Sequence, residues 1–553
     1  MAMNGGEALV STLISHGIET TFCVPGESYL TVLEALRVNR NRIRLVLCRH
    51  ESGAAFAADA NAKVTGKPGV AFVTRGPGAT NASIGLHTAK QDSAPLVLFI
   101  GHVPTREMGR EAFQEIDYPK AFGPLTKTVI EVMRPEDCAA ATAEALRVAL
   151  DRRPGPVAVV LPEDVTEGEA GDLPIPAFVP RVPRLPTAPS LDTAAHLIRN
   201  ARHPMVIAAE QIGFERAHGA LAAFAEASGA GIGSGFRRQD VIPYDHPANL
   251  GNFGLVLAPF QKEYWAEVDL VVFAGARPDG CTIQDYELLR DDQAVIHIYP
   301  EREAFRETSP TLPIEADAKP TLEALTQRLA GWSPPAERLA WRRKYHEAYR
   351  RFATPGLDPK AKALGRVDMA QVVAQLGKRL PTDASVVNDS GAFASWFHRH
   401  YPYAAPHGQL AACLGAMGYG MPGALGAQLA RPDKTVVAVM GDGGFLMTGQ
   451  EIVTAVQQRL PIKVICCDNG MYGSIATHQY RRGGLDGLYG TVMNSPDFAA
   501  LARAYGAAAW TVEETAGFLP ALEAALKHQD GPALIHLKTD MRDLNAIGPQ
   551  MAA

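Results

Sequence analysis

A chain of 553 residues is long enough for several domains with large apolar cores, and its 47% apolar and 20% charged residues are ordinary for a globular protein. A net charge of -6, a pI near 6.3 and the lack of any Lys/Arg run argue against a nucleic-acid partner. Because there is no apolar run of membrane-spanning length and no basic start followed by an apolar stretch, we expect a cytoplasmic protein with no membrane partner.

The first part of the chain alternates helical patterns with short apolar runs. A helical pattern over residues 4–16 ends at Gly17, and further helical patterns cover 53–64 and 82–89. The apolar runs lie at 22–24, 43–48, 70–74 and 96–100. Such alternation predicts a parallel sheet covered by helices.

Two more blocks of the same kind follow. A Pro-rich stretch at 161–190 predicts a linker, and apolar runs at 205–208, 270–274 and 294–298 then begin a second α/β pattern. The charged, Pro-marked segment 332–359 predicts another boundary. We therefore expect an α/β protein of three domains, each a doubly wound and mostly parallel sheet, over residues 1–170, 188–335 and 362–553. The glycines at 229–235 fit Gly-x-Gly-x-x-Gly in no register and do not predict a nicotinamide site.

The seven cysteines are scattered and odd in number, mostly within apolar runs. This pattern is typical of reduced, buried thiols rather than of disulfides, and it predicts no metal or redox role. They are Cys23, Cys48, Cys138, Cys281, Cys413, Cys466 and Cys467.

The third block contains the most informative motif. An apolar run at 436–440 stops at Gly-Asp-Gly-Gly, a helical pattern runs from about 446 to 460, and a second apolar run at 462–467 ends at Asp-Asn-Gly. This predicts a βαβ unit with Asp442 and Asn469 at the carboxyl ends of parallel strands. A carboxylate and an amide beside glycines, without Cys or His, favour Mg²⁺ bridging a diphosphate. The alternative is a purely structural strand-to-helix turn with an N-terminal acid.

A single carboxylate, Glu51, lies where the apolar run 45–48 passes into a small-residue helix. On its own it is better explained as a first-turn acid that complements the helix dipole.

With these two motifs the chain resembles the thiamine diphosphate enzymes, whose Gly-Asp-Gly is followed after some two dozen residues by Asn-Asn, here Asp468-Asn469. The resemblance implies that Asp442, Asn469 and the backbone carbonyl of Met471 bind Mg²⁺. It also implies that Glu51, in the matching run 49–55, drives the aminopyrimidine of thiamine diphosphate into its imino tautomer.

Other matches cover the whole chain and identify it as similar to the acetolactate synthase-like branch. Residues 76–81, 112–115 and 415–420 match family segments, although Arg75 stands where serine is usual. In the last segment the Gly415 carbonyl would face the amino group and Met417 would wedge the cofactor into its bent form; alone, Met417 would be a core methionine. The remaining cofactor-binding residues implied are Pro25, Thr74, Gly78, Asn81, Gly391, Gly441, Gly443, Gly444, Tyr472, Gly473 and Ser474.

The resemblance implies a homodimer or homotetramer in which one site takes Glu51 and the Gly-Asp-Gly motif from different subunits. It implies decarboxylation of a 2-oxo acid, followed by protonation or by carboligation to an aldehyde or ketone. Thr105-Arg106 and Ile475 replace the His-His pair and glutamate of pyruvate decarboxylases, which disfavours simple decarboxylation.

Residues outside the common core are expected to choose the substrate. His478 and Cys281 stand where acetolactate synthases have a pocket tryptophan and an acceptor-binding arginine, and only Arg277 and Asp279 of the FAD region look familiar, so FAD is possible but unsupported. Arg75 or Arg106 is a candidate for carboxylate recognition. The candidates that face the substrate are Glu27, Ser28, Gln114, Ser474 and His478, the last being equally well a surface histidine.

We expect a carboligating decarboxylase of acetolactate synthase-like type. One alternative is a lyase that cleaves a 2-hydroxy ketone or a 2-hydroxyacyl thioester. The other is a non-catalytic, cofactor-binding regulatory subunit, which the presence of Glu51, Asp442 and Asn469 disfavours.

Overall fold

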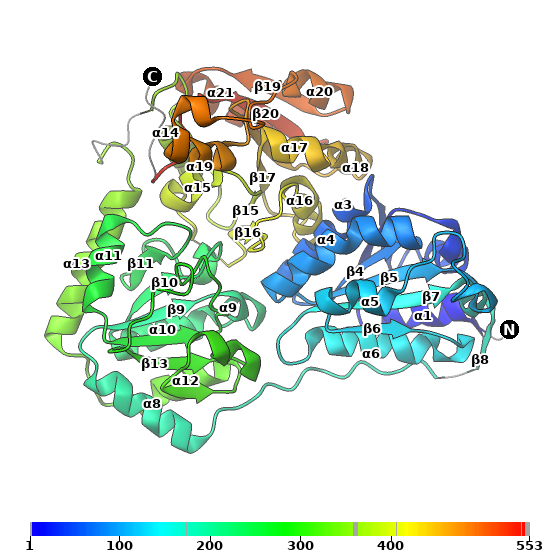
Figure 1. The fold of residues 1–553 in the computed structure, drawn as a ribbon, viewed down its shortest axis with the longest axis horizontal. Coiled ribbons are helices and arrows are strands. Elements are labelled where there is room, and N and C mark those ends of the chain that lie inside the picture. Colours follow the sequence, from blue (N-terminus) through cyan, green and yellow to red (C-terminus); the bar gives the residue numbers. More distant parts are fainter. Residues whose placement is uncertain (1–2, 173, 358–362, 405, 544, 548–553) are drawn as a thin grey trace.

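The protein folds as three α/β domains that form a triangle in Figure 1, an N-terminal domain in blue and cyan, a central domain in green and a C-terminal domain in yellow to red. This computed structural model describes residues 3–172, 174–357, 363–404, 406–543 and 545–547. Each domain contains one six-stranded sheet in which all paired strands run parallel. The predicted fold class is therefore confirmed.

The N-terminal sheet has the strand order β3-β2-β4-β5-β7-β6. Its three central strands are buried along their whole length, which explains their continuous apolar character. Helices cover both faces of the sheet (Figure 1). The strands are β2 (Thr20–Cys23), β3 (Arg44–Leu47), β4 (Gly69–Val73), β5 (Leu96–His102), β6 (Thr128–Glu131) and β7 (Pro156–Pro162), and the main helices are α1 (Gly5–Ser15), α2 (Leu30–Val38), α3 (Glu51–Thr65), α4 (Gly76–Asp92) and α6 (Cys138–Leu150).

The central sheet has the order β11-β10-β9-β12-β13-β14, with its topological switch point between β9 and β12. Gly231 and Gly233 lie in β10, where a Cβ would clash with Leu250 and Phe253, so these glycines serve close packing. The strands are β9 (Pro204–Ala208), β10 (Gly231–Ser234), β11 (Asn249–Asn252), β12 (Leu270–Ala274), β13 (Ala294–Ile298) and β14 (Leu312–Ile314), and the main helices are α8 (Ala188–Asn200), α10 (His218–Ser228), α11 (Pro259–Glu267), α12 (Ala318–Arg328) and α13 (Ala336–Ala353).

The C-terminal sheet has the order β16-β15-β17-β18-β20-β19. Its strands are β15 (Ser385–Asn388), β16 (Gln409–Ala411), β17 (Val436–Gly441), β18 (Lys463–Asp468), β19 (Ala508–Val512) and β20 (Ala533–Lys538). The helices are α14 (Met369–Arg379), α15 (Ala394–His400), α16 (Gly420–Ala430), α17 (Asp442–Thr448), α18 (Ile452–Gln457), α19 (Gly473–Gly483), α20 (Phe498–Ala504) and α21 (Thr515–Lys527).

Three local predictions were wrong. The stretch 161–190 is a linker only in part, because it includes the end of β7, helix α7 (Glu163–Glu167) and strand β8 (Glu169–Gly171), which pairs with β1 (Met3–Asn4). Residues 174–187 run as an extended segment below the N-terminal and central domains, and residues 188–190 begin α8 (Figure 1). The boundary segment 332–359 is mostly helix α13, whose Trp341 and Tyr345 pack into the central core; residues 358 and 359 lie outside the described part. The helix expected at 446–460 begins at Asp442 and is interrupted by a 3₁₀ turn, Gly449–Glu451.

All seven cysteines are free, five of them buried, as the sequence predicts. None of the helices in the described part of the chain combines the length and the apolar character that crossing a membrane requires.

Candidate active site

A cavity of about 240 Å³ opens at the carboxyl end of the C-terminal sheet. Strands β17 and β18 are parallel neighbours with Gly441 opposite Cys467, so Asp442 and Asn469 follow the ends of adjacent strands. The cavity is lined by many of the residues predicted to bind the cofactor, namely Gly391, Gly415, Met417, Gly441, Asp442, Gly443, Gly444, Asn469, Met471, Tyr472, Gly473 and Ser474.

Two oxygens suited to a hard cation converge in this cavity. The backbone N–H of Met471 donates to Asp442 Oδ2 at 3.1 Å and to Asn469 Oδ1 at 3.3 Å, so both oxygens lie beside the same backbone group. The neighbouring Asp468 is held by protein partners, because its oxygens accept a hydrogen bond from Ser495 Oγ at 2.6 Å and contact His536 Nε2 at 2.9 Å. The donor set of a carboxylate and an amide oxygen fits Mg²⁺.

The electrostatics of the pair also fit a cation. Burial raises the pKa of Asp442 to about 6, and the nearby Asp468 carboxylate acts in the same direction. Burial would likewise raise the pKa of Asp468, but hydrogen bonds from His536 and Ser495 outweigh it and hold that pKa below its usual range. A divalent cation beside Asp442 would offset the cost of its buried charge.

Two glycines in the wall of the cavity allow close packing of the backbone. A Cβ on Gly443 would lie 2.7 Å from the Tyr472 ring, and one on Gly444 would clash with a carboxylate oxygen of Asp389. Asp389 itself is fully buried and accepts backbone hydrogen bonds from Gly418 at 3.0 Å and Tyr419 at 3.1 Å. The two glycines therefore let the backbone that lines the cavity pack closely against Tyr472 and Asp389.

Glu51 and its predicted neighbours form a second cluster in the N-terminal domain. Glu51 is the first residue of α3, and Asn81 Nδ2 from α4 donates to Glu51 Oε2 at 3.0 Å. A Cβ on Gly78 would lie 3.4 Å from Glu51 Oε1. Pro25 is exposed in the loop after β2, and Thr74, at the end of β4, is hydrogen bonded to Ser28 at 2.8 Å. None of these residues lines the cavity of the C-terminal domain in the same chain.

Glu451 was missed by sequence reasoning. Its buried carboxylate lies in the C-terminal domain, yet Oε1 accepts the backbone N–H groups of Arg49 at 2.8 Å and His50 at 3.1 Å. These groups directly precede Glu51, so the carboxylate fixes the start of α3. A glutamate in a predicted helix gave no signal of this contact.

The candidate for carboxylate recognition, Arg75, is already paired. Only 8% exposed, it contacts Glu27 Oε1 at 2.5 Å and Glu163 Oε1 at 3.4 Å. Glu27 remains exposed at the end of β2. The backbone N–H of Glu27, followed by the hydrogen bond from Arg75, holds the pKa of this carboxyl below its usual range. Arg75 is therefore engaged in orienting Glu27 and is not a free cation.

The other substrate candidates are spread more widely. Ser474 and Ile475 line the cavity, whereas His478 is exposed further along α19 and does not. Arg106 is exposed and contacts Glu107. Gln114 adopts a left-handed backbone conformation with φ of 65°, and its buried Oε1 has no hydrogen-bond partner.

Two residues of the central domain that look familiar from the FAD region, Arg277 and Asp279, make contacts within the protein. At the switch point, the carboxylate of Glu210 accepts hydrogen bonds from the Arg277 N–H at 3.1 Å and the Tyr299 hydroxyl at 2.9 Å. The Arg277 side chain binds Gln91, and Asp279 caps the N–H of Thr282, so both familiar residues serve the protein's own contacts.

Comparison with known proteins agrees with this architecture. Family profiles of the thiamine pyrophosphate enzymes match in order: the N-terminal TPP binding domain at residues 3–121, the central domain at 191–325 and the C-terminal TPP binding domain at 389–537. The acetolactate synthase isozyme 2 large subunit of Escherichia coli is 32% identical over 97% of this chain and 96% of its own length.

Two further relatives are similar to nearly the same extent. A probable acetolactate synthase large subunit of Methanocaldococcus jannaschii is 31% identical over 91% of this chain and 86% of its own length. The putative thiamine pyrophosphate-containing protein YdaP of Bacillus subtilis is 31% identical over 96% and 90%. Matches of this identity and extent, together with three parallel-sheet domains in the same order, show that the chain belongs to the thiamine diphosphate enzymes and to their acetolactate synthase-like branch.

Proposed function

We propose that the protein uses thiamine diphosphate and Mg²⁺ to decarboxylate a 2-oxo acid and to join the remaining fragment to a second carbonyl compound. The observation that carries this proposal is that the Asp442 and Asn469 oxygens lie beside the same backbone group, the Met471 N–H, in the wall of one cavity. The bound cofactor supplies a nucleophilic carbon and an electron sink.

The chain's own residues would have distinct tasks. Asp442, Asn469 and the carbonyl of Met471 would hold the metal, and the backbone at Gly443 and Gly444 would border the diphosphate. Glu51 would hold a proton at the pyrimidine ring, with Asn81 fixing its carboxylate at 3.0 Å. Glu27, aimed by Arg75, is the exposed carboxylate available to accept a proton from the substrate.

We further propose that each site is shared by two copies of the chain in a homodimer or homotetramer. In support, the cavity is lined only by residues of the C-terminal domain, while Glu51 belongs to a separate cluster. We also propose three domains, with the bounds 1–170, 188–335 and 362–553; residue 362 itself lies outside the described part. The proposed location is cytoplasmic.

Product analysis by NMR tests the reaction. The purified protein is incubated with thiamine diphosphate, Mg²⁺ and pyruvate, with and without an added aldehyde, and Glu51→Gln is the matched inactive control. Acetolactate or an acyloin that forms only with the unaltered enzyme would support carboligation. Turnover of a 2-hydroxy ketone panel without consumption of any 2-oxo acid would replace the proposal by the lyase activity. Cofactor binding without turnover of either class would favour a regulatory subunit.

A further inference from the structure

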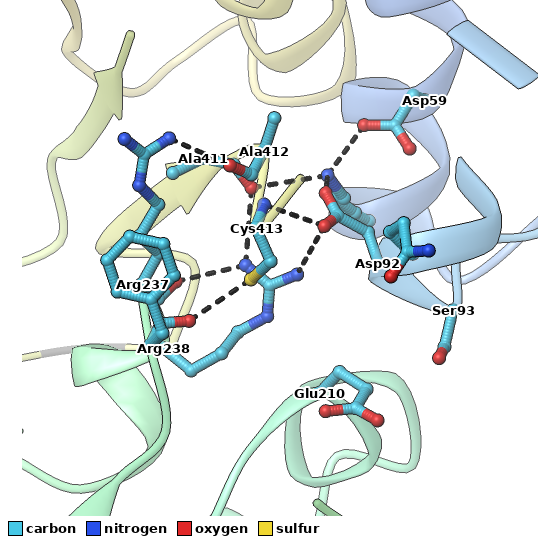
Figure 2. Close-up of polar contacts among 12 residues, drawn as sticks. Asp59, Asp92, Ser93, Glu210, Arg237, Arg238, Ala411, Ala412 and Cys413 are labelled. Carbon is cyan, nitrogen blue, oxygen red and sulfur yellow. Dashed lines mark hydrogen bonds and ion pairs between the residues drawn. The ribbon is translucent and has the colours of Figure 1, made fainter. Parts of the chain in front are cut away.

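A buried ionic network lies where the three domains meet (Figure 2). The N-terminal domain contributes Asp59 and Lys63 from α3 and Asp92 from the end of α4, and the central domain contributes Arg237 and Arg238 from the loop after β10. Lys63 Nζ lies 2.6 Å from Asp59 Oδ2 and also contacts Asp92, while Arg238 Nη2 lies 3.6 Å from Asp92 Oδ1. A network of this kind costs desolvation and is retained where it specifies an arrangement.

Residues of the network form hydrogen bonds with one segment of the C-terminal domain, residues 411–419, which we call the cofactor loop. At its start, Arg238 Nη1 donates to the Ala411 carbonyl at 3.2 Å and Arg237 Nη1 to the Ala412 carbonyl at 2.7 Å. The N–H of Cys413 donates to Asp92 Oδ1 at 2.7 Å. Charged side chains from two other domains therefore hold three consecutive residues of the loop (Figure 2).

The far end of the cofactor loop is held as well. Asp389 accepts the N–H groups of Gly418 and Tyr419, and the Tyr419 hydroxyl donates to Asp59 Oδ2 at 2.8 Å. Between the two anchored ends lie Gly415 and Met417, which line the cavity. Arg237 Nη1 also donates to Ser390 Oγ at 2.8 Å, and Ser390 is another lining residue.

We propose that Asp92, Arg237 and Arg238 are positioning residues that fix the cofactor loop, so that affinity for thiamine diphosphate depends on them although none of them lines the cavity. This inference rests on the proposed use of thiamine diphosphate. The central domain would then contribute to cofactor binding in its own chain, because Arg237 and Arg238 hold the backbone of the loop that carries Gly415 and Met417.

Two glutamine variants test the proposal, Arg237→Gln and Arg238→Gln, with Arg328→Gln as the matched control. Arg328 belongs to the same domain and makes only a partly exposed pair with Asp192. Calorimetric titration with thiamine diphosphate and excess Mg²⁺ should show a Kd raised on the order of ten-fold in both variants and unchanged in the control. Hydrogen exchange of peptides covering the cofactor loop, measured without cofactor, should be faster in the two variants only.

A merely structural role for the arginines predicts a lower Tm with unchanged Kd and unchanged exchange in the cofactor loop, and that result overturns the proposal. Should a glutamine variant fail to fold, Arg237→Lys and Arg238→Lys keep the charge but lose the guanidinium geometry; equal affinity in these variants also overturns it. Failure of the unaltered protein to bind thiamine diphosphate would instead refute the proposed function, and binding without turnover would refute only the reaction.

Discussion

Replacing Glu451 should disturb Glu51, the glutamate proposed to act on the cofactor, from the neighbouring domain. The Glu451 carboxylate is buried, and it accepts the N–H groups of Arg49 and His50 through Oε1 and the Thr454 hydroxyl through Oε2 at 2.6 Å. The two N–H groups belong to the turn that starts α3, whose first residue is Glu51. Glu451 therefore helps to fix this turn, together with the hydrogen bond from the Ser52 N–H to the His50 ring at 3.2 Å.

The size of the effect follows from the groups left unpaired. In Glu451→Ala two partly buried N–H groups lose their acceptor; a fully buried group would cost roughly 1–3 kcal/mol, so the free energy of unfolding should fall by about 2 kcal/mol for the pair. In Glu451→Gln the amide oxygen still accepts both bonds and only the charge is lost, so the cost should be about 1 kcal/mol. Gly53→Ala should resemble Glu451→Ala, because a Cβ at residue 53 would clash with Glu451 Oε1.

The assay combines urea unfolding with turnover at saturating thiamine diphosphate. We expect Glu451→Ala and Gly53→Ala to lose both stability and at least about ten-fold in kcat, and Glu451→Gln to retain most of both. If Glu451→Ala is destabilised but keeps its kcat, the start of α3 is not set by Glu451, and the reasoning that links Glu451 to Glu51 is refuted.

Three further substitutions probe separate features. Gly444→Ala should abolish measurable thiamine diphosphate binding by calorimetry, because its Cβ would clash with Asp389 and displace the backbone. Unaltered affinity would contradict the proposal that the backbone at Gly443 and Gly444 borders the diphosphate. Burial lowers the pKa of Lys463 to about 8, so the folded state disfavours its charge at pH 7 and gains stability as the pH rises from about 8 toward the unfolded value. The Tm of Lys463→Met should accordingly exceed that of the unaltered protein at pH 7, and the difference between the two Tm values should be smaller at pH 9.5. A difference that does not change with pH would exclude this charge effect. Arg75→Ala should raise the pKa of Glu27 and move the acidic limb of kcat/KM to higher pH, whereas an unchanged limb would remove Glu27 from proton transfer.

The sheets of this protein were partly legible in the sequence because their buried strands are continuous apolar runs. Strands β12 and β13 lie where the runs predict them, and β17 and β18 are the parallel neighbours that the βαβ pattern implies. Strands such as β16 and β15 were not predicted, because they are short and contain polar residues, Gln409 and Asn388, whose partners are tertiary. Segment 332–359 was misjudged since its charged helix buries a stripe of aromatic residues.

The candidate site also has a part that the sequence predicts and a part that it does not. The residues expected to face the cofactor are predictable from local motifs, because glycines, a carboxylate and an amide within some thirty residues fold into one strand-helix-strand unit. Its supporting contacts join positions remote in sequence, such as Glu451 with Arg49 across 402 residues and Arg237 with Ala412 across 175. No periodicity or spacing encodes such pairs, so only the folded chain reveals them.

A site shared between subunits can be tested by mixing two inactive variants. Glu51→Gln spoils one component of the site and Asn469→Ala the other, and random pairing in a dimer makes half of the assemblies mixed. In a mixed dimer one site combines the intact Glu51 of one copy with the intact Asn469 of the other, so co-expressed, separately tagged variants should recover about a quarter of the unaltered activity. If each chain contained a whole site, every chain in the mixture would still carry a lesion, and activity would stay at the level of the single variants.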